Sequence, residues 1–88
     1  MDGNALMSLR KKFGLTQNAM AAKMGLSRRA YFNSEVSGEE KINARHQLLA
    51  ERVALSEAVS QGDPSLATPN VRQEAEALAK MLDDPKRT

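Results

Sequence analysis

The stretch LTQNAMAAKMGLSRRAYFNSE, residues 15–35, decides how this chain folds. Helix-forming residues occupy both halves of it, and Gly25 divides them. Glycine adopts the left-handed backbone conformation that ends many helices, so we expect one helix to stop there and another to start soon after. The stretch therefore predicts two short helices, over about 17–24 and about 28–36, joined by a tight turn.

Capping and packing residues support this helix pair. Thr16 and Ser27 are good N-caps, because their hydroxyl oxygens accept hydrogen bonds from the first free amides of a helix. Ala21 is small enough for the second helix to cross the first closely, and Tyr31 is the inward-facing residue of the second helix. Apolar residues surround the turn at Met20, Met24 and Leu26. Two short helices joined by a glycine-containing turn are the sequence form of a helix-turn-helix.

The second helix of the pair has a polar face opposite Tyr31. At about 100° per residue, Arg29 and Asn33 lie about 160° and about 200° from Tyr31. Phe32 flanks them, and Arg28 is in the first turn. Arginine can donate to guanine O6 and N7, asparagine can pair with adenine, and phenylalanine can touch a thymine methyl. The same residues also suit a solvated helix face, and Phe32 also suits packing against the preceding helix or a partner. Because of the turn, we favour base contacts by Arg28, Arg29 and Asn33. Phe32 is the fourth candidate for base contact, and for it the packing interpretation stays equally open.

Other polar residues around the helix pair suit the phosphate backbone of DNA. Gln17 opens the first helix, whose free amides and positive end suit a phosphate. Lys41 and Arg45 flank the start of a later helix, although the carboxylates of Glu39 and Glu40 beside them would repel phosphates. The predicted phosphate contacts are Thr16, Gln17, Asn18, Ser27, Lys41, Asn43 and Arg45.

The rest of the chain also predicts helices, which makes the protein all-α. Apolar residues recur at helical spacing over about 4–13, about 44–61 and about 71–84. The segment GDPSLATPN, residues 62–70, contains two prolines and predicts a linker. We therefore expect a helix-turn-helix domain at 1–61, followed by the linker and a C-terminal helix.

The formal charge is distributed unevenly along the chain. The net charge of all 88 residues is +2. Residues 1–33 contain six Lys and Arg and one acidic residue, whereas residues 34–88 contain seven basic and ten acidic residues. A basic first third suits either an anion-binding face or an ordinary solvated surface, and charge alone does not choose between them.

Several classes of function lack support in the sequence. The chain has no cysteine, which fits a reducing cytoplasm and excludes disulfides and thiolate metal sites. The sequence contains neither an 18-residue apolar run nor a signal-peptide pattern. We therefore expect a soluble, cytoplasmic protein that does not associate with a membrane. The only histidine, His46, has no spaced metal-ligand partner and is expected at the surface. We expect no catalytic residue, no metal, no cofactor and no small-molecule ligand.

The segment LRKKFGLTQNAMAAKMGLSRRAYFNSEVSG, residues 9–38, resembles the lambda-repressor-like (Xre-type) helix-turn-helix family. The resemblance extends over about residues 4–55. Its motifs are Arg10, Gly14-Leu15-Thr16-Gln17, Ala21, Met24-Gly25-Leu26-Ser27, Tyr31 and Glu35. It implies a compact five-helix domain in which Gln17 holds the DNA backbone, Arg28, Arg29 and Asn33 read bases, and Arg10 pairs with Glu35.

The chain departs from the family pattern at one place. Ser34 occupies the position before the glutamate where the family usually has a large apolar residue, and the next glycine comes later, at Gly38. We expect Val36 to fill the resulting gap on a slightly longer helix.

The second half of the chain has more apolar surface than one small core needs. The last helix either folds back on the helix at 44–61 within one subunit, or both helices form a two-fold dimer interface. We favour the homodimer, because two reading helices about 34 Å apart match the helical repeat of DNA, and two-fold dimers are the commonest oligomers. The predicted interface consists of Leu55, Val59, Val71, Leu78, Met81 and Leu82.

These observations predict a sequence-specific, double-stranded DNA-binding transcriptional regulator that recognises an inverted-repeat operator. By analogy with small family members such as phage control proteins and antitoxins, we expect a repressor, with autorepression of its own operon as the hypothesis that the analogy suggests. The alternative is a small helical protein-interaction module, antitoxin-like or an adaptor, without specific DNA binding. An adaptor would have no reason to keep Arg28, Arg29 and Asn33 on one face.

Overall fold

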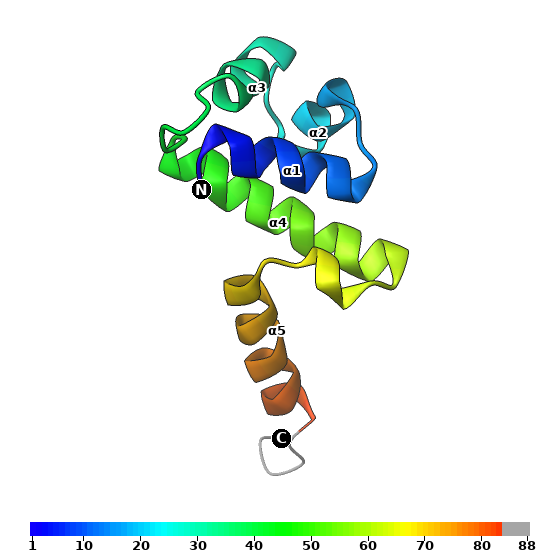
Figure 1. Ribbon diagram of the computed structural model, residues 1–88. Coiled ribbons are helices and arrows are strands. Elements are labelled where there is room, and N and C mark those ends of the chain that lie inside the picture. Colours follow the sequence, from blue (N-terminus) through cyan, green and yellow to red (C-terminus); the bar gives the residue numbers. More distant parts are fainter. Residues whose placement is uncertain (84–88) are drawn as a thin grey trace.

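The computed structural model describes residues 1–83 of the chain (Figure 1). The described part contains five α-helices and one short 3-10 helix. In chain order they are α1 (Gly3–Phe13), α2 (Gln17–Met24), α3 (Arg28–Glu35), α4 (Ala44–Gln61), η1 (Pro64–Leu66) and α5 (Pro69–Leu82). The all-α class with five α-helices is therefore confirmed.

The turn between α2 and α3 forms as its residues predict. The Thr16 hydroxyl oxygen accepts from the Ala19 amide at the start of α2, and the Ser27 hydroxyl oxygen accepts from the Ala30 amide at the start of α3. Gly25 ends α2 with a φ angle of 71°, in the left-handed region that side chains disfavour. Capping at these three positions therefore sets both ends of α2 and the start of α3.

Helices α1, α2 and α3 lie together on one side of the long helix α4 (Figure 1). Leu6 from α1, Met20 from α2 and Tyr31 from α3 are each 0% exposed at the centre of this arrangement. The same core contains Phe13, Ala21, Met24, Ile42, Ala50, Val53, Ala54, Ala58, Leu66 and Ala67. Burial of these side chains is the main stabilising contribution to the fold.

The first residues of the chain tie α1 to the loop between α3 and α4. The Ile42 amide donates to the Met1 carbonyl over 3.1 Å, and the Asn4 amide donates to the Gly38 carbonyl over 3.0 Å. Gly3 is buried between them, so close to α3 that an added Cβ would lie 2.5 Å from the Glu35 carbonyl oxygen. This close approach fixes the C-terminal end of α3 against the start of α1.

The predicted linker at residues 62–70 is wrong in part. Leu66 and Ala67 are 4% and 6% exposed and belong to the core, and η1 occupies the middle of the segment. Helix α5 starts at Pro69 rather than at 71, because proline is well suited to the first turn of a helix. The predicted end at residue 84 lies outside the described residues. The connection is therefore packed onto α4 rather than extended.

Helix α5 projects from the rest of the molecule (Figure 1). No residue of Pro69–Leu82 is buried, although Val71 packs partly against the core. The described residues extend over 48 × 23 × 20 Å, with α5 at one end of the long direction. None of the helices within residues 1–83 is long and apolar enough to cross a membrane.

Candidate nucleic-acid interface

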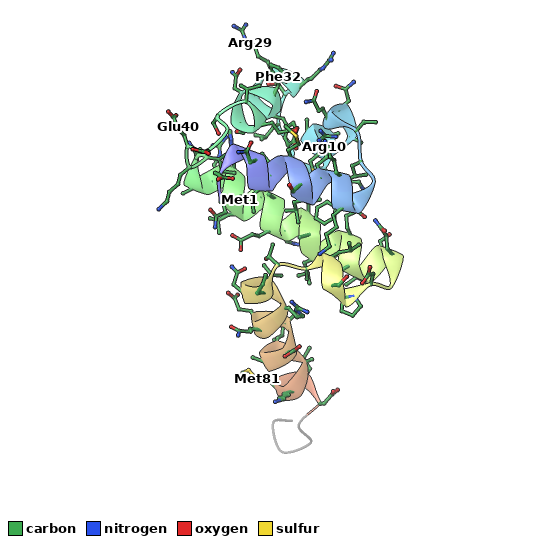
Figure 2. The ribbon with its side chains drawn as sticks, viewed as in Figure 1. Met1, Arg10, Arg29, Phe32, Glu40 and Met81 are labelled. Carbon is green, nitrogen blue, oxygen red and sulfur yellow. The ribbon has the colours of Figure 1, made fainter. Side chains whose placement is uncertain are left out.

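The outward face of α3 carries the four side chains predicted to contact bases. Arg28, Arg29 and Asn33 are exposed, and Phe32 is 46% exposed. Tyr31, on the opposite side of the helix, is fully buried. Figure 2 shows Arg29 extending away from the body of the protein, at the end farthest from α5. Three buried residues of α3, Tyr31, Ser34 and Glu35, thus orient its polar face toward solvent.

The start of α2 lies beside this face. Gln17, at the first position of α2, lines a shallow hollow of about 400 Å³ together with Arg28, Arg29 and Phe32 of α3. The two helices pack directly against each other, so the turn between them brings these side chains together. The positive end of the α2 dipole lies next to Gln17, and it favours a negatively charged group.

Three of the predicted phosphate contacts also cap helices. The oxygens of Thr16 and Ser27 accept from backbone amides over 3.1 Å each, and the Asn43 side-chain oxygen accepts from the Arg45 amide over 2.8 Å. Capping uses the acceptor atoms of these side chains. Their hydroxyl hydrogens and the Asn43 amide nitrogen remain suitable donors to a phosphate oxygen.

Lys41, Asn43 and Arg45 form a second exposed group at the start of α4. They follow the C-terminal end of α3, whereas Gln17 adjoins its N-terminal residues. Glu39 and Glu40 are exposed in the same loop, and Figure 2 shows Glu40 at the edge of the molecule. The loop therefore has a mixed charge, unlike the face formed by α2 and α3.

An ion pair between Arg10 and Glu35 joins α1 to the C-terminal end of α3. Arg10 of α1 donates to both carboxylate oxygens of Glu35, from Nε over 3.1 Å and from Nη2 over 3.0 Å. Its third nitrogen donates to the Leu15 carbonyl oxygen over 3.0 Å. Glu35 is 1% exposed, and its carboxylate raises the pKa of Arg10. The pair that the family resemblance implied is present, and it joins α1, the turn before α2 and the end of α3.

The Tyr31 hydroxyl lies close to this ion pair. It is buried and has no hydrogen-bond partner of ordinary geometry among residues 1–83. Burial raises the pKa of Tyr31, and the Glu35 carboxylate raises it further. The phenol is therefore held in its neutral form.

Val36 does not fill the space that Ser34 leaves where the family usually has a large apolar residue. Val36 is 60% exposed and caps α3 rather than extending it, so its predicted role is wrong. Ser34 is 7% exposed, and its hydroxyl hydrogen-bonds Nδ1 of His46 over 2.7 Å. His46 is thus half-buried between α3 and α4, not on the open surface. A polar pair replaces apolar packing at this position, and nothing in the spacing of the two residues predicted it.

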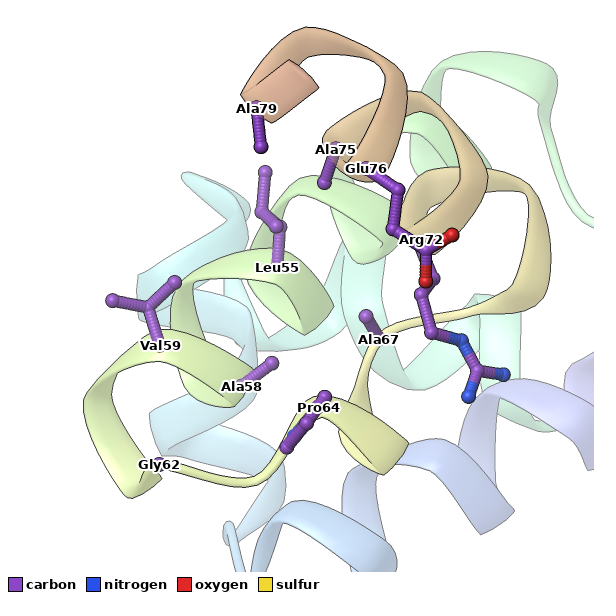
Figure 3. A pocket seen from close by; sticks show the side chains of 10 residues that line it. All are labelled: Leu55, Ala58, Val59, Gly62, Pro64, Ala67, Arg72, Ala75, Glu76 and Ala79. Carbon is purple, nitrogen blue, oxygen red and sulfur yellow. The ribbon is translucent and has the colours of Figure 1, made fainter. Parts of the chain in front are cut away.

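The apolar residues predicted at a dimer interface lie at the other end of the molecule. Val59, Leu78, Met81 and Leu82 are 76%, 56%, 46% and 76% exposed, respectively. Leu55 is half-buried and points toward α5 in Figure 3. It lines a groove of about 470 Å³ between α4 and α5, whose walls include Ala58, Val59, Ala75 and Ala79. Most of this apolar surface is left open by the single chain.

Other kinds of site are not apparent in the described part. Residues 1–83 contain no group of three His, Cys, Asp or Glu side chains placed to hold a metal ion. Comparison with protein-family models, curated protein sequences and solved structures finds no match for the chain. The interpretation of the α2–α3 face therefore depends on the chemistry of its own residues.

Proposed function

We propose that this protein is a sequence-specific, double-stranded DNA-binding transcriptional regulator of the lambda-repressor-like type. It would place α3 in the major groove of DNA, which is wide enough to admit a helix. The observation that carries the proposal is the outward face of α3, where Arg28, Arg29, Phe32 and Asn33 are exposed beside the start of α2.

The residues of this face match the hydrogen-bonding groups of base edges. Arg29 extends away from the protein body and can donate two parallel hydrogen bonds to guanine. Asn33 follows it by one helical turn and can pair with adenine through its side-chain amide. Arg28, in the first turn, reaches either a base or a phosphate. Specificity would come from these contacts.

Phosphate contacts would hold α3 in register with the groove. Gln17 and Asn18 offer backbone amides at the start of α2, and their side chains can also donate. Ser27 and Thr16 add their hydroxyl hydrogens. On the other side, Lys41, Asn43 and Arg45 supply donors, with Glu39 and Glu40 weakening the approach there.

A second subunit would supply the remaining affinity. One α3 helix offers only a few base contacts, which is less than specific DNA-binding proteins use. The open apolar surface of α4 and α5 suits a two-fold homodimer, which binds an inverted repeat with half-sites about 34 Å apart. Such a dimer would act as a repressor by occluding a promoter, including that of its own operon.

Selection from a random double-stranded DNA library, followed by fluorescence anisotropy, tests this function. We expect an enriched inverted repeat that binds more tightly than a scrambled duplex of the same composition. Between about 50 and about 200 mM salt, affinity should fall by about 10³-fold or more, because phosphate contacts release counterions. Equal, weak binding to both duplexes would reject specific DNA recognition.

The second candidate is a helical protein-interaction module. The exposed side chains of Val59, Leu78 and Leu82 favour it, because open apolar surfaces mark protein contacts. They do not account for the polar face of α3, which the DNA-binding proposal explains. If the selection enriches no sequence, this second function becomes the better one.

A further inference from the structure

Phe32 is an exposed aromatic residue among cations. It is 46% exposed, and its neighbours Arg28, Arg29 and Asn33 on α3 are exposed as well. It forms one wall of the shallow hollow of about 400 Å³ whose other walls are Gln17, Arg28 and Arg29. The hollow thus combines an apolar wall with two guanidinium groups and a side-chain amide.

The edges of the bases differ in what they offer such a hollow. In the major groove, guanine and adenine present N7 with O6 or an amino group, and cytosine presents an amino group. Thymine alone adds a methyl group. A phenylalanine placed against polar edges would desolvate them without supplying a hydrogen bond, which costs free energy. Contact with the thymine methyl has no such cost.

From this we infer that the hollow between Gln17, Arg28, Arg29 and Phe32 receives the methyl group of a thymine, and that Phe32 determines the preference for that base. The inference rests on the proposed function and specifies one base of its operator. Phe32 acts as a specificity-determining residue, while Arg28 and Arg29 bind the neighbouring acceptors.

Charge complementarity favours DNA over a protein as the occupant of this hollow. An apolar side chain of a protein partner would have to displace water from two guanidinium groups without pairing them, which is costly. DNA supplies phosphates and guanine acceptors to the same cations while its methyl group meets the ring. The composition of the hollow therefore matches a methylated base within a polyanion.

Replacement of thymine by uracil tests the inference, because it removes the methyl group and keeps every hydrogen-bonding group. Each thymine of the selected operator is replaced in turn, and Kd is measured by anisotropy. At one position in each half-site we expect the wild-type protein to bind about 4-fold more weakly, the loss expected for one buried methyl. The Phe32→Ala variant should bind thymine and uracil at that position equally.

Val36→Ala is the matched control, because Val36 is an exposed apolar residue at the end of the same helix. It should keep the full discrimination between thymine and uracil. Thermal melting confirms that both variants fold, which is expected for exposed positions. An operator on which no uracil weakens binding, or a discrimination that persists in Phe32→Ala, overturns the inference alone. Failure to select any sequence overturns the proposed function and the inference together.

Discussion

At the scale of single residues, we expect removal of the Glu35 carboxylate to destabilise the fold strongly. It is 1% exposed, and the Arg10 guanidinium donates to both of its oxygens. Truncation to alanine would leave the Arg10 charge partly buried without its partner, and breaking such a pair costs several kcal/mol. We expect Glu35→Ala to lower the free energy of unfolding by about 3–5 kcal/mol.

Chemical denaturation measures this difference directly. Glu39→Ala is the matched control, because Glu39 is exposed and makes the same change of charge. It should shift stability by no more than about 0.5 kcal/mol. Equal stabilities for Glu35→Ala and the wild-type protein would mean that the ion pair contributes nothing net.

Tyr31 should make the protein sensitive to alkaline pH. Its pKa is raised in the folded protein by burial and by the Glu35 carboxylate, so the folded state retains the phenol proton more tightly than the unfolded state does. This stabilisation is complete below the unfolded pKa of about 10 and is lost as pH rises above that value. We expect wild-type stability to fall more than that of Tyr31→Phe between about pH 9 and about pH 11, measured by urea denaturation. Parallel losses in both proteins would contradict the prediction.

Gly3 should not tolerate a side chain. An added Cβ would lie 2.5 Å from the Glu35 carbonyl oxygen and 2.6 Å from the Ser34 carbonyl oxygen, and backbone atoms cannot rotate away. Alanine gains up to about 1 kcal/mol of helix propensity, but overpacking costs about 1–3 kcal/mol. We therefore expect a net loss of stability and a lower melting temperature for Gly3→Ala. Asn4→Ala, at the exposed next position of α1, is the control and should melt close to the wild-type temperature.

At the scale of helices, local signals predicted the α2–α3 pair and failed for the segment after α4. Thr16, Gly25 and Ser27 act through their own neighbours in the chain, so their residue types are sufficient to indicate where helices begin and end. Leu66 is buried by residues of other helices, and proline-rich composition contains no information about such contacts. That is why the segment was predicted as a linker and is instead part of the core.

Some features of the candidate site could likewise be predicted from local sequence, and others could not. Helical periodicity predicted that Arg29 and Asn33 face away from Tyr31, because only the geometry of one helix is involved. The hollow shared by Gln17 and Phe32 depends on how two helices cross, which periodicity does not define. The hydrogen bond between Ser34 and His46 joins α3 to α4 and needed the three-dimensional structure to be found.

Helix α3 should lose specificity when Arg29 is truncated. If Arg29 donates to a base, Arg29→Ala should weaken operator binding by about 1–3 kcal/mol and relax the preference at one position per half-site. The dependence of binding on salt should stay unchanged, since no phosphate contact is lost. Arg52→Ala on α4 removes the same charge from an exposed position away from α3 and serves as the control. An equal loss on every sequence, with a smaller salt dependence, would instead make Arg29 a phosphate contact.

At the scale of the whole molecule, two different surfaces lie at opposite ends. The polar face of α3 is at one end, and the apolar face of α5 projects from the other (Figures 1 and 2). The core between them is closed by α4, which contacts α1, α2 and α5. The proposed DNA binding and the proposed subunit contact would therefore change independently, and a substitution on α5 tests the second without changing the first.

Leu78→Glu should separate the subunits of a dimer and spare the fold of each. Leu78 is 56% exposed in the single chain, so a charge there does not disturb the monomer, but it would be buried against a second copy of α5. In sedimentation, we expect the wild-type protein at twice the mass of one chain and the variant at the mass of one chain.

The same variant should show what the dimer contributes to DNA binding. Affinity for the complete inverted repeat should fall by about 100-fold or more, because the second half-site is no longer bound by a linked subunit. Affinity for an isolated half-site should not change, since α3 is intact. Gln73→Glu adds the same charge at an exposed position on the far side of α5 from Leu78 and should leave both properties unchanged. A wild-type protein that sediments as a single chain both on and off DNA would contradict the predicted dimer.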